Sequence, residues 1–176
     1  MPSIAAENEV TIQNLFAAFE GESNAHAKYT AFAIKADEDG LHGAASLFRA
    51  AGRAEQIHAA NHARVIKQLG AEAKCTIHPV DVQSTLDNLK AALSGEQHEI
   101  DVMYPEFLAE AEAHANTLAI RTFTGALEAE KCHARLYGEA IALLQGGQLD
   151  SWIAAVREFY VCPVCNCPWE KFEIIR

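Results

Sequence analysis

Two short stretches decide the fold: Glu55-Gln-Ile-His58 and Glu130-Lys-Cys-His133. In each, a glutamate is followed three residues later by a histidine. Residues i and i+3 lie about 60° apart around a helix, so both side chains can point to the same side. A carboxylate and an imidazole that converge in this way suit a first-row metal ion. One such match is weak evidence, because helices rich in glutamate and histidine produce it by chance.

The arrangement occurs twice along the chain, which strengthens it. Glu22 follows a glycine and precedes Glu55 by 33 residues, and Glu96 follows a glycine and precedes Glu130 by 34 residues. This spacing predicts two helical hairpins in which the six side chains meet in one layer of the core. A glutamate from each of two helices and a Glu-x-x-His from each of two others is the pattern of di-metal carboxylate bundles. The alternative is four surface glutamates and two incidental histidines.

Helical periodicity predicts four long helices, joined by two short links and one longer loop. Pro105 is expected to kink the third helix or displace a backbone hydrogen bond. The loop is long enough to cross the bundle, and it would also allow helix pairs to exchange between two subunits. We therefore predict an all-α, ferritin-like four-helix bundle with a long crossover between helices 2 and 3. The predicted helices span residues 8–37, 42–69, 84–114 and 116–145, and the loop spans 71–82.

We divide the chain into a bundle over residues 1–147 and a C-terminal part over residues 148–176. A short helix is expected at 151–158, followed by a tail that contains cysteines. His62 lies one turn after His58. The alternatives are a residue that supports the metal ligands and a polar residue on the face of the bundle, and we favour the second.

The composition excludes several classes of protein. The formal net charge is −10, which makes nucleic acids and anionic membranes poor partners. No apolar run reaches the roughly 18 residues of a membrane span, and the N-terminus does not have the pattern of a signal peptide. Five cysteines, an odd number, do not suggest a secreted disulfide framework. These features predict a cytoplasmic protein.

Four motifs, in this order and spacing, make the chain similar to the rubrerythrin family. They are Phe19-Glu-Gly-Glu-Ser-Asn-Ala, Ala54-Glu-Gln-Ile-His58, Ser94-Gly-Glu-Gln-His-Glu99 with Tyr104-Pro105, and Ala129-Glu-Lys-Cys-His133. The resemblance implies two iron ions held by seven ligands, of which two glutamates bridge the metals. The bridging residues would be Glu55 and Glu130, with Glu22 completing the first iron, and Glu96 and His133 completing the second.

The seventh ligand comes from the resemblance alone. It implies that the first iron is held by His58 when reduced and by Glu99 when oxidised. By itself Glu99 would be interpreted as an ordinary exposed glutamate. Tyr29 and Tyr104 match tyrosines that surround the family's metal site, where their hydroxyl groups would orient ligand carboxylates. The alternative for both tyrosines is simple core packing. The expected catalytic residues are thus Glu99, His58, Tyr29 and Tyr104.

The tail departs from the family, whose members usually end in a rubredoxin-like module with two Cys-x-x-Cys knuckles around one iron. Here Cys162-Pro-Val-Cys165 resembles the first knuckle, and Cys167-Pro-Trp-Glu resembles the segment after the second, with the stretch between them missing. A tetrahedral site needs four ligands. Three alternatives remain. Cys162 and Cys165 would complete a four-thiolate site with the same two residues of a second chain, or all three cysteines would bind a metal together with a fourth ligand from elsewhere. In the third alternative, the tail binds no metal. We favour the tail without metal.

The resemblance implies a peroxidase that reduces hydrogen peroxide to water and protects the cell against oxidative stress. In the family, the rubredoxin-like module relays electrons to the di-iron site. Because this module is shortened here, the electrons are expected from an external donor, a rubredoxin or an NAD(P)H-dependent reductase. A homodimer is expected. Manganese or mixed metals are also compatible with hard carboxylate ligands. The alternatives are a ferroxidase or oxidase that acts on dioxygen and iron(II), and a non-enzymatic iron-binding protein.

Overall fold

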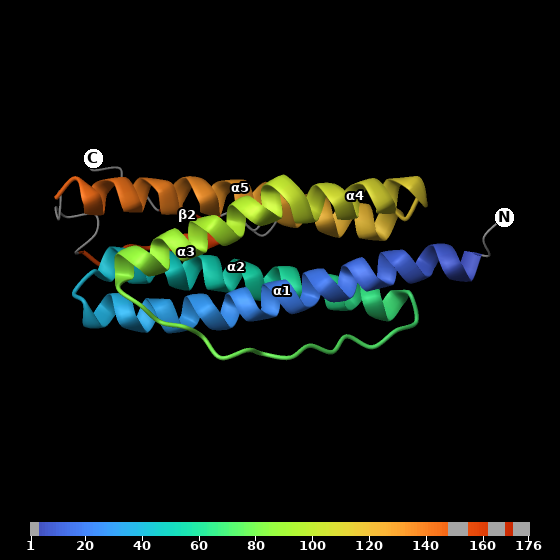
Figure 1. Ribbon diagram of the computed structural model, residues 1–176, viewed down its shortest axis with the longest axis horizontal. Coiled ribbons are helices and arrows are strands. Elements are labelled where there is room, and N and C mark those ends of the chain that lie inside the picture. The colour runs from blue at the N-terminus through green and yellow to red at the C-terminus, as the bar shows by residue number, and fades with distance from the viewer. Residues whose placement is uncertain (1–3, 148–154, 162–167, 171–176) are drawn as a thin grey trace.

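The fold is known from a computed structural model that describes residues 4–147, 155–161 and 168–170. Long helices run side by side along the molecule (Figure 1). The first two helices pair antiparallel, and the remaining helices form a second antiparallel pair. This is the predicted four-helix bundle. The helical elements are α1 Ile4–Glu38, α2 His42–Gln68, α3 Thr85–His98, the π-helical segment η1 Glu99–Met103, α4 Tyr104–Ala113 and α5 Thr117–Gln145.

The third helix of the bundle is interrupted where proline was expected to disturb it. Pro105 has no N–H and is tolerated only in a first helical turn, where no bond from it is needed. It occupies the second position of α4. Just before it, the N–H of Tyr104 donates to the carbonyl of Glu99, five residues back, which is the π-helical pattern. The predicted displacement of a backbone hydrogen bond is therefore confirmed.

Local signals fix the helix ends. The hydroxyl of Ser84 accepts a hydrogen bond from the backbone N–H of Asp87 at 3.2 Å and so caps α3. Asn116 caps α5 in the same way, accepting from the N–H of Ala119 at 3.1 Å. Gly40 and Gly70 follow α1 and α2 with φ angles of +72° and +87°, a conformation that favours glycine.

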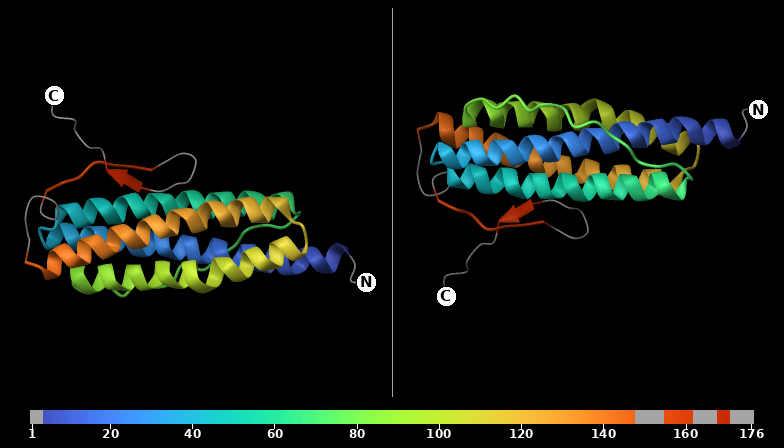
Figure 2. Two further views of the ribbon diagram at one scale, coloured as in Figure 1. Left: turned by 90° about the horizontal axis from the view of Figure 1, so that it is seen from above. Right: turned by 90° about the horizontal axis from the view of Figure 1, so that it is seen from below.

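Residues 69–84 form the crossover, which runs the length of the bundle along the outside of α1 (Figures 1 and 2). Because of it, α2 and α3 run in the same direction, as the ferritin-like arrangement requires. Asn24 on α1 anchors the crossover. Its side chain accepts from the N–H of His78 at 2.8 Å and donates to the carbonyl of Thr76 at 2.9 Å.

Two apolar clusters fill the bundle, one toward each end. The first contains the aromatic side chains of Tyr29, Phe32, Phe48 and Tyr137. The second contains Leu15, Ile66, Tyr104 and Phe123. On α1, α2 and α5, buried polar residues occur between the positions that contribute to the two clusters. The bundle therefore has a polar layer enclosed by apolar packing at both ends.

The C-terminal part contributes a small antiparallel pair of strands, β1 Phe159–Val161 and β2 Pro168–Glu170, which lies beside α2 (Figure 2). The backbone N–H of Arg157 donates to the hydroxyl of Ser46 on α2 at 3.1 Å. Of the predicted short helix, the described part at 155–158 is not helical. Cys162, Cys165 and Cys167 lie outside the described residues.

No helix in the described ranges is long and apolar enough to span a membrane.

Candidate metal centre

The polar layer is built from six of the seven predicted ligands. Each bundle helix contributes: one glutamate comes from α1, one from α3, and a Glu-x-x-His pair from each of α2 and α5. All six side chains are buried, with at most 1% of any residue exposed. They are Glu22, Glu55, His58, Glu96, Glu130 and His133.

These side chains form two groups, each with ligand atoms within 4.8 Å of one another. Both groups contain Glu55 and Glu130. The first group adds His58 and Glu22, and the second adds His133 and Glu96. The arrangement offers two adjacent metal positions that share two carboxylates.

The two shared carboxylates divide their oxygens between the two histidines. Glu55 places Oε2 at 2.9 Å from Nδ1 of His58 and Oε1 at 3.0 Å from Nδ1 of His133. Glu130 places Oε1 at 3.0 Å from Nδ1 of His58 and Oε2 at 2.7 Å from Nδ1 of His133. One oxygen of each carboxylate thus faces each position, which is the geometry of bridging ligands.

The donor atoms of this layer fit metal ions better than they fit one another. Although Nδ1 of His58 and of His133 lies within 3.0 Å of the oxygens of Glu55 and Glu130, these contacts do not have hydrogen-bond geometry. Among the described residues, these oxygens and both ring nitrogens of each histidine have no hydrogen-bond partner. Buried polar atoms without a partner are costly, so native proteins pair them or bind a cation there. Carboxylate and imidazole together are the usual donors for first-row transition metals.

The electrostatics agree with a site made for cations. In the absence of metal, burial and the neighbouring Glu55 raise the pKa of Glu130 to about 8. Burial raises the pKa of Glu55 as well. For His58 and His133, burial opposes the charged form, but the surrounding carboxylates raise the pKa of both imidazoles well above the usual range. Without metal the layer therefore holds protons where metal charges would stand.

Two tyrosines orient the terminal carboxylates. Tyr29 on α1 donates a hydrogen bond of 2.5 Å to Oε1 of Glu96 on α3. Tyr104, the first residue of α4, donates to Oε1 of Glu22 on α1. Burial raises the pKa of both phenols well above the usual range, so they are neutral donors. The two hydroxyl groups bond the carboxylates, as predicted, in addition to packing in the core.

His62 has a different place from the one expected of it. It is fully buried, so the prediction of a residue on the bundle face is wrong. Since Tyr104 donates its proton to Glu22, its oxygen accepts from Nε2–H of His62 at 3.2 Å. Nδ1 of His62 then accepts from the hydroxyl of Thr122 at 3.0 Å. The sequence signal was its position seven residues after Glu55, two helical turns along the same face.

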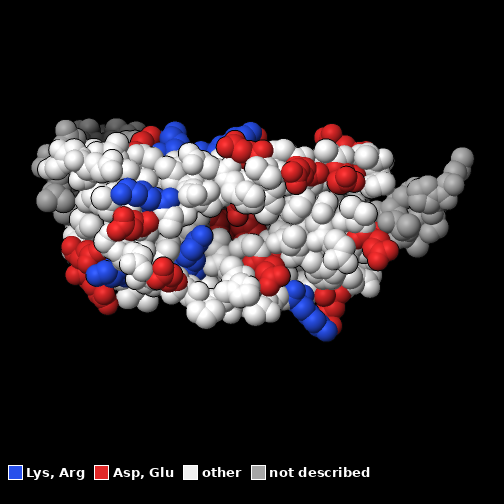
Figure 3. Space-filling model, viewed as in Figure 1, with Lys and Arg blue, Asp and Glu red and all other residues white. Residues whose placement is uncertain are grey.

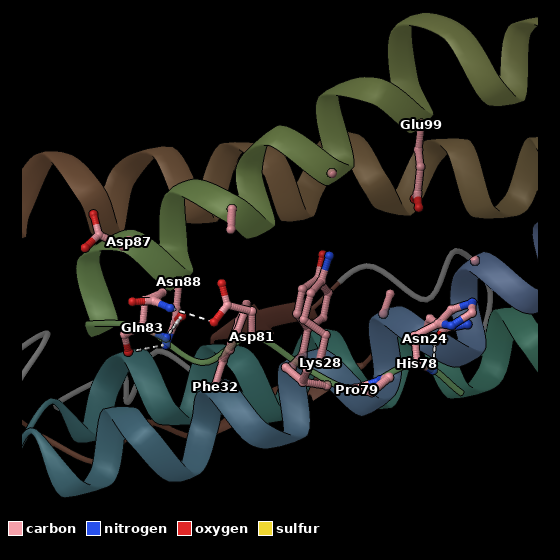
Figure 4. Close-up of a pocket in the computed structure, with 16 residues that line it drawn as sticks. Asn24, Lys28, Phe32, His78, Pro79, Asp81, Gln83, Asp87, Asn88 and Glu99 are labelled. Carbon is pink, nitrogen blue, oxygen red and sulfur yellow. Dashed lines mark hydrogen bonds between the residues drawn. The ribbon is translucent and has the colours of Figure 1, made fainter. Parts of the chain in front are cut away.

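Glu99 stands outside both groups. It is partly exposed, and Figure 4 shows it pointing from the third helix of the bundle toward the space above α1. Burial, followed by the charges of Glu22 and Glu130, raises its pKa well above the usual range. The structure thus brings six predicted ligands together and leaves the seventh beside them, at the inner end of a cavity lined by Glu99 and Tyr29.

Comparison with known proteins identifies the relatives of this chain. The model of the rubrerythrin family matches residues 13–141. The chain belongs to the rubrerythrin family. It is 36% identical over 164 residues to rubrerythrin-2 of Clostridium acetobutylicum, covering 93% of this chain and 87% of the relative. It is 37% identical over 157 residues to nigerythrin of Nitratidesulfovibrio vulgaris, covering 89% and 74%.

Solved structures show the same helical bundle. The fully reduced, all-ferrous state of nigerythrin superposes with a TM-score of 0.82 at 34% identity, over 93% of this chain and 78% of that one. A bacterioferritin from Desulfovibrio desulfuricans has a TM-score of 0.76 at 21% identity, over 89% and 91%, which shows the fold alone. The predicted ferritin-like fold is confirmed. Membership of the rubrerythrin family and the two groups of buried donors also confirm the prediction of a di-iron centre.

Proposed function

We propose that this protein is a di-iron peroxidase that reduces hydrogen peroxide to water. The observation that carries the proposal is the position of Glu99. Six donors form a closed, buried layer, while a seventh carboxylate lies outside both groups at the inner end of a half-open cavity. A protein that only stores metal would not need a further carboxylate, such as Glu99, between the six buried donors and the solvent.

The proposed ligand roles follow the two groups. Glu55 and Glu130 would hold both metal ions, because each turns one oxygen toward each histidine. Glu22 and His58 complete the first position, while Glu96 and His133 complete the second. Glu99, whose carboxyl group is affected by the charges of Glu22 and Glu130, would be a further ligand for the first position in the oxidised state.

When bound, iron supplies the two electrons that break the O–O bond. The side chains of the chain do the rest. Glu99 has a raised pKa, so a proton can reside on its carboxyl group next to the incoming peroxide. Tyr29 and Tyr104 hold Glu96 and Glu22 in fixed orientations through the whole cycle. The apolar clusters on both sides of the layer exclude bulk water.

The electrons are proposed to come from an external donor, a rubredoxin or an NAD(P)H-dependent reductase. The support is in the sequence: the tail carries one Cys-x-x-Cys knuckle where an internal four-thiolate relay needs two. A role in oxidative stress, a cytoplasmic location and a homodimer, domain-swapped or not, stay predictions. The choice of iron over manganese at each position belongs to the same proposal.

Stopped-flow mixing tests the proposal. The iron-loaded protein is reduced without oxygen and mixed with hydrogen peroxide or, separately, with dioxygen, while the absorbance of the oxidised centre is recorded. We expect oxidation by peroxide to be much faster than oxidation by dioxygen. Rapid oxidation by dioxygen with no advantage for peroxide would instead identify an oxidase or ferroxidase. Stoichiometric metal uptake without turnover would identify a metal-binding protein.

A further inference from the structure

A cavity of about 500 Å³ opens between α1, α3 and the crossover, with Glu99 among its lining residues. In Figure 3 the same face of the molecule is hollowed near its middle, and acidic atoms lie at the floor of the hollow. Figure 4 shows Glu99 directed into this space, with Phe32 and Asn88 farther along it. The cavity therefore leads from the surface to Glu99 and to Tyr29, the hydrogen-bond donor of Glu96.

The chain builds this cavity with fixed walls. The crossover that closes one side is held to α1 because the Asn24 side chain donates to the carbonyl of Thr76 and accepts from the N–H of His78. Gly21 and Gly95, the glycines of the repeated Gly-Glu pairs, both line the cavity. A Cβ atom on Gly21 would meet nothing within 4 Å, and one on Gly95 would meet only the ammonium of Lys28 at 3.6 Å. Both glycines thus leave space directly beside the ligand layer.

The cavity is much larger than hydrogen peroxide needs. A water molecule takes up about 30 Å³ in the liquid, and cavities of the observed size commonly bind small organic molecules. From Ala91 to Glu99 the wall extends along about 12 Å of helix. Away from Glu99 the lining is mixed: Phe32, Val80 and Ala91 are apolar, and Lys28, Asp81 and Asn88 are among the polar residues beside them. The volume and these apolar residues leave room for a small organic molecule that has its reactive group at Glu99.

We propose that this cavity admits organic hydroperoxides, ROOH, with the hydroperoxy group beside Glu99 and the R group along Phe32, Val80 and Ala91. The proposal rests on the proposed peroxidase function and names a wider substrate class for the same site. The O–O bond breaks, and the two electrons come from the reduced metal centre, which the external donor replenishes. Two protons are taken up, so the products are the alcohol ROH and one water molecule.

Ala91 offers a direct test, because it is exposed on α3 and lines the outer part of the cavity. Ala91→Trp fills that part, and Ala109→Trp, at an exposed position of α4 away from the cavity, is the matched control. Reduced, iron-loaded protein is mixed with cumene hydroperoxide or hydrogen peroxide. The unmodified protein should react with both. In Ala91→Trp, the rate of oxidation by cumene hydroperoxide should fall about tenfold or more, and the rate of oxidation by hydrogen peroxide should fall less than about twofold. The control should change neither rate.

Binding of the product alcohol gives a second measurement that does not depend on turnover. Saturation-transfer NMR with cumyl alcohol on the oxidised holoprotein should detect binding to the unmodified protein and the control, and much weaker binding to Ala91→Trp. The proposal is overturned if hydrogen peroxide reacts and cumene hydroperoxide does not, or if Ala91→Trp slows both oxidants equally or neither. If neither oxidant reacts, the proposed peroxidase function itself fails.

Discussion

Tyr29 on α1 donates a 2.5 Å hydrogen bond to Glu96 on α3. In the opposite direction, Tyr104 on α4 donates a hydrogen bond to Glu22 on α1. Each half of the repeat therefore supplies the hydroxyl group that orients the terminal carboxylate of the other half. The two helical hairpins are coupled through the metal layer as well as through apolar packing.

Tyr29→Phe should show how much this hydrogen bond contributes to the free energy of unfolding. The change removes the hydroxyl and keeps the ring, so Glu96 loses its buried donor at a cost of about 1–3 kcal/mol in the free energy of unfolding. Urea unfolding of the metal-loaded protein measures it. Tyr137→Phe is the matched control, because this tyrosine is also buried and packs on Tyr29, and its hydroxyl is not hydrogen-bonded to a carboxylate. Equal losses in the two variants would contradict the assigned role.

The repeat explains why so much of this site was predictable. Periodicity and the positions of Gly40 and Gly70 place the helices within a few residues of their observed ends, because both glycines stop helices by adopting positive φ. Matched spacing from Glu22 to Glu55 and from Glu96 to Glu130 brings the carboxylates to one height, as hairpin geometry requires.

The features that spacing did not reveal depend on contacts between helices. Nothing local to Tyr29 shows that its partner is Glu96, 67 residues away. The burial of His62 likewise depends on Thr122, which α5 brings to it. The position of Glu99 outside both groups follows the π-helical segment that begins there, whose register is set by the proline six residues later.

Glu99→Ala should lower peroxidase turnover more than metal binding. The six buried donors remain in this variant, so two metals per chain should still bind. Turnover with hydrogen peroxide should fall roughly tenfold or more, because the carboxylate beside the incoming peroxide is lost. Metal analysis and steady-state rates measure the two effects. Asp101→Ala, an exposed acidic position in the same π-helical segment, should change neither. A parallel loss of metal and turnover would count against the switching role of Glu99.

His62→Leu should destabilise the protein although His62 is not a predicted ligand. The change leaves the hydroxyl of Thr122 and the oxygen of Tyr104 without their buried partner, at a cost of about 1–3 kcal/mol in unfolding free energy. His98→Leu, at an exposed position on α3, should stay within about 0.5 kcal/mol of the original. Chemical denaturation at neutral pH distinguishes them. Similar stabilities for the two variants would show that the hydrogen bonds of His62 are dispensable.

The metal-free protein should lose stability as the pH rises from about 6.5 to about 8. Glu130 keeps its proton in the folded state up to a pKa of about 8, whereas the unfolded chain releases it near 4.5. The raised pKa values of His58 and His133 act in the same direction. The folded state thus binds more protons in this range, and its advantage disappears as they dissociate. His62, whose burial lowers its pKa, has the opposite effect only below about 6.5.

Urea midpoints across this pH range, with and without two equivalents of iron(II) under nitrogen, provide the measurement. Because metal ions displace the protons, the urea midpoint of the loaded protein should depend much less on pH. Metal loading should also release protons into unbuffered solution. A metal-free midpoint that rises with pH would show that the layer is not protonated as described.

Glu130→Leu should lower both the stability of the metal-free protein and its metal content. Glu130 is fully buried, neither oxygen has a hydrogen bond among the described residues, and it belongs to both groups of donors. Without metal, Glu130 lies 2.7–3.0 Å from the imidazoles of His58 and His133 and raises the pKa of both, so its loss leaves these buried groups without that partner. The change should lower the unfolding free energy of the metal-free protein by about 3–5 kcal/mol. Metal content should fall well below two per chain. Glu128→Leu, at an exposed position where the carboxylate pairs with Lys131, should change neither quantity. A metal-free Glu130→Leu as stable as the original protein would show that the two histidines do not depend on this carboxylate.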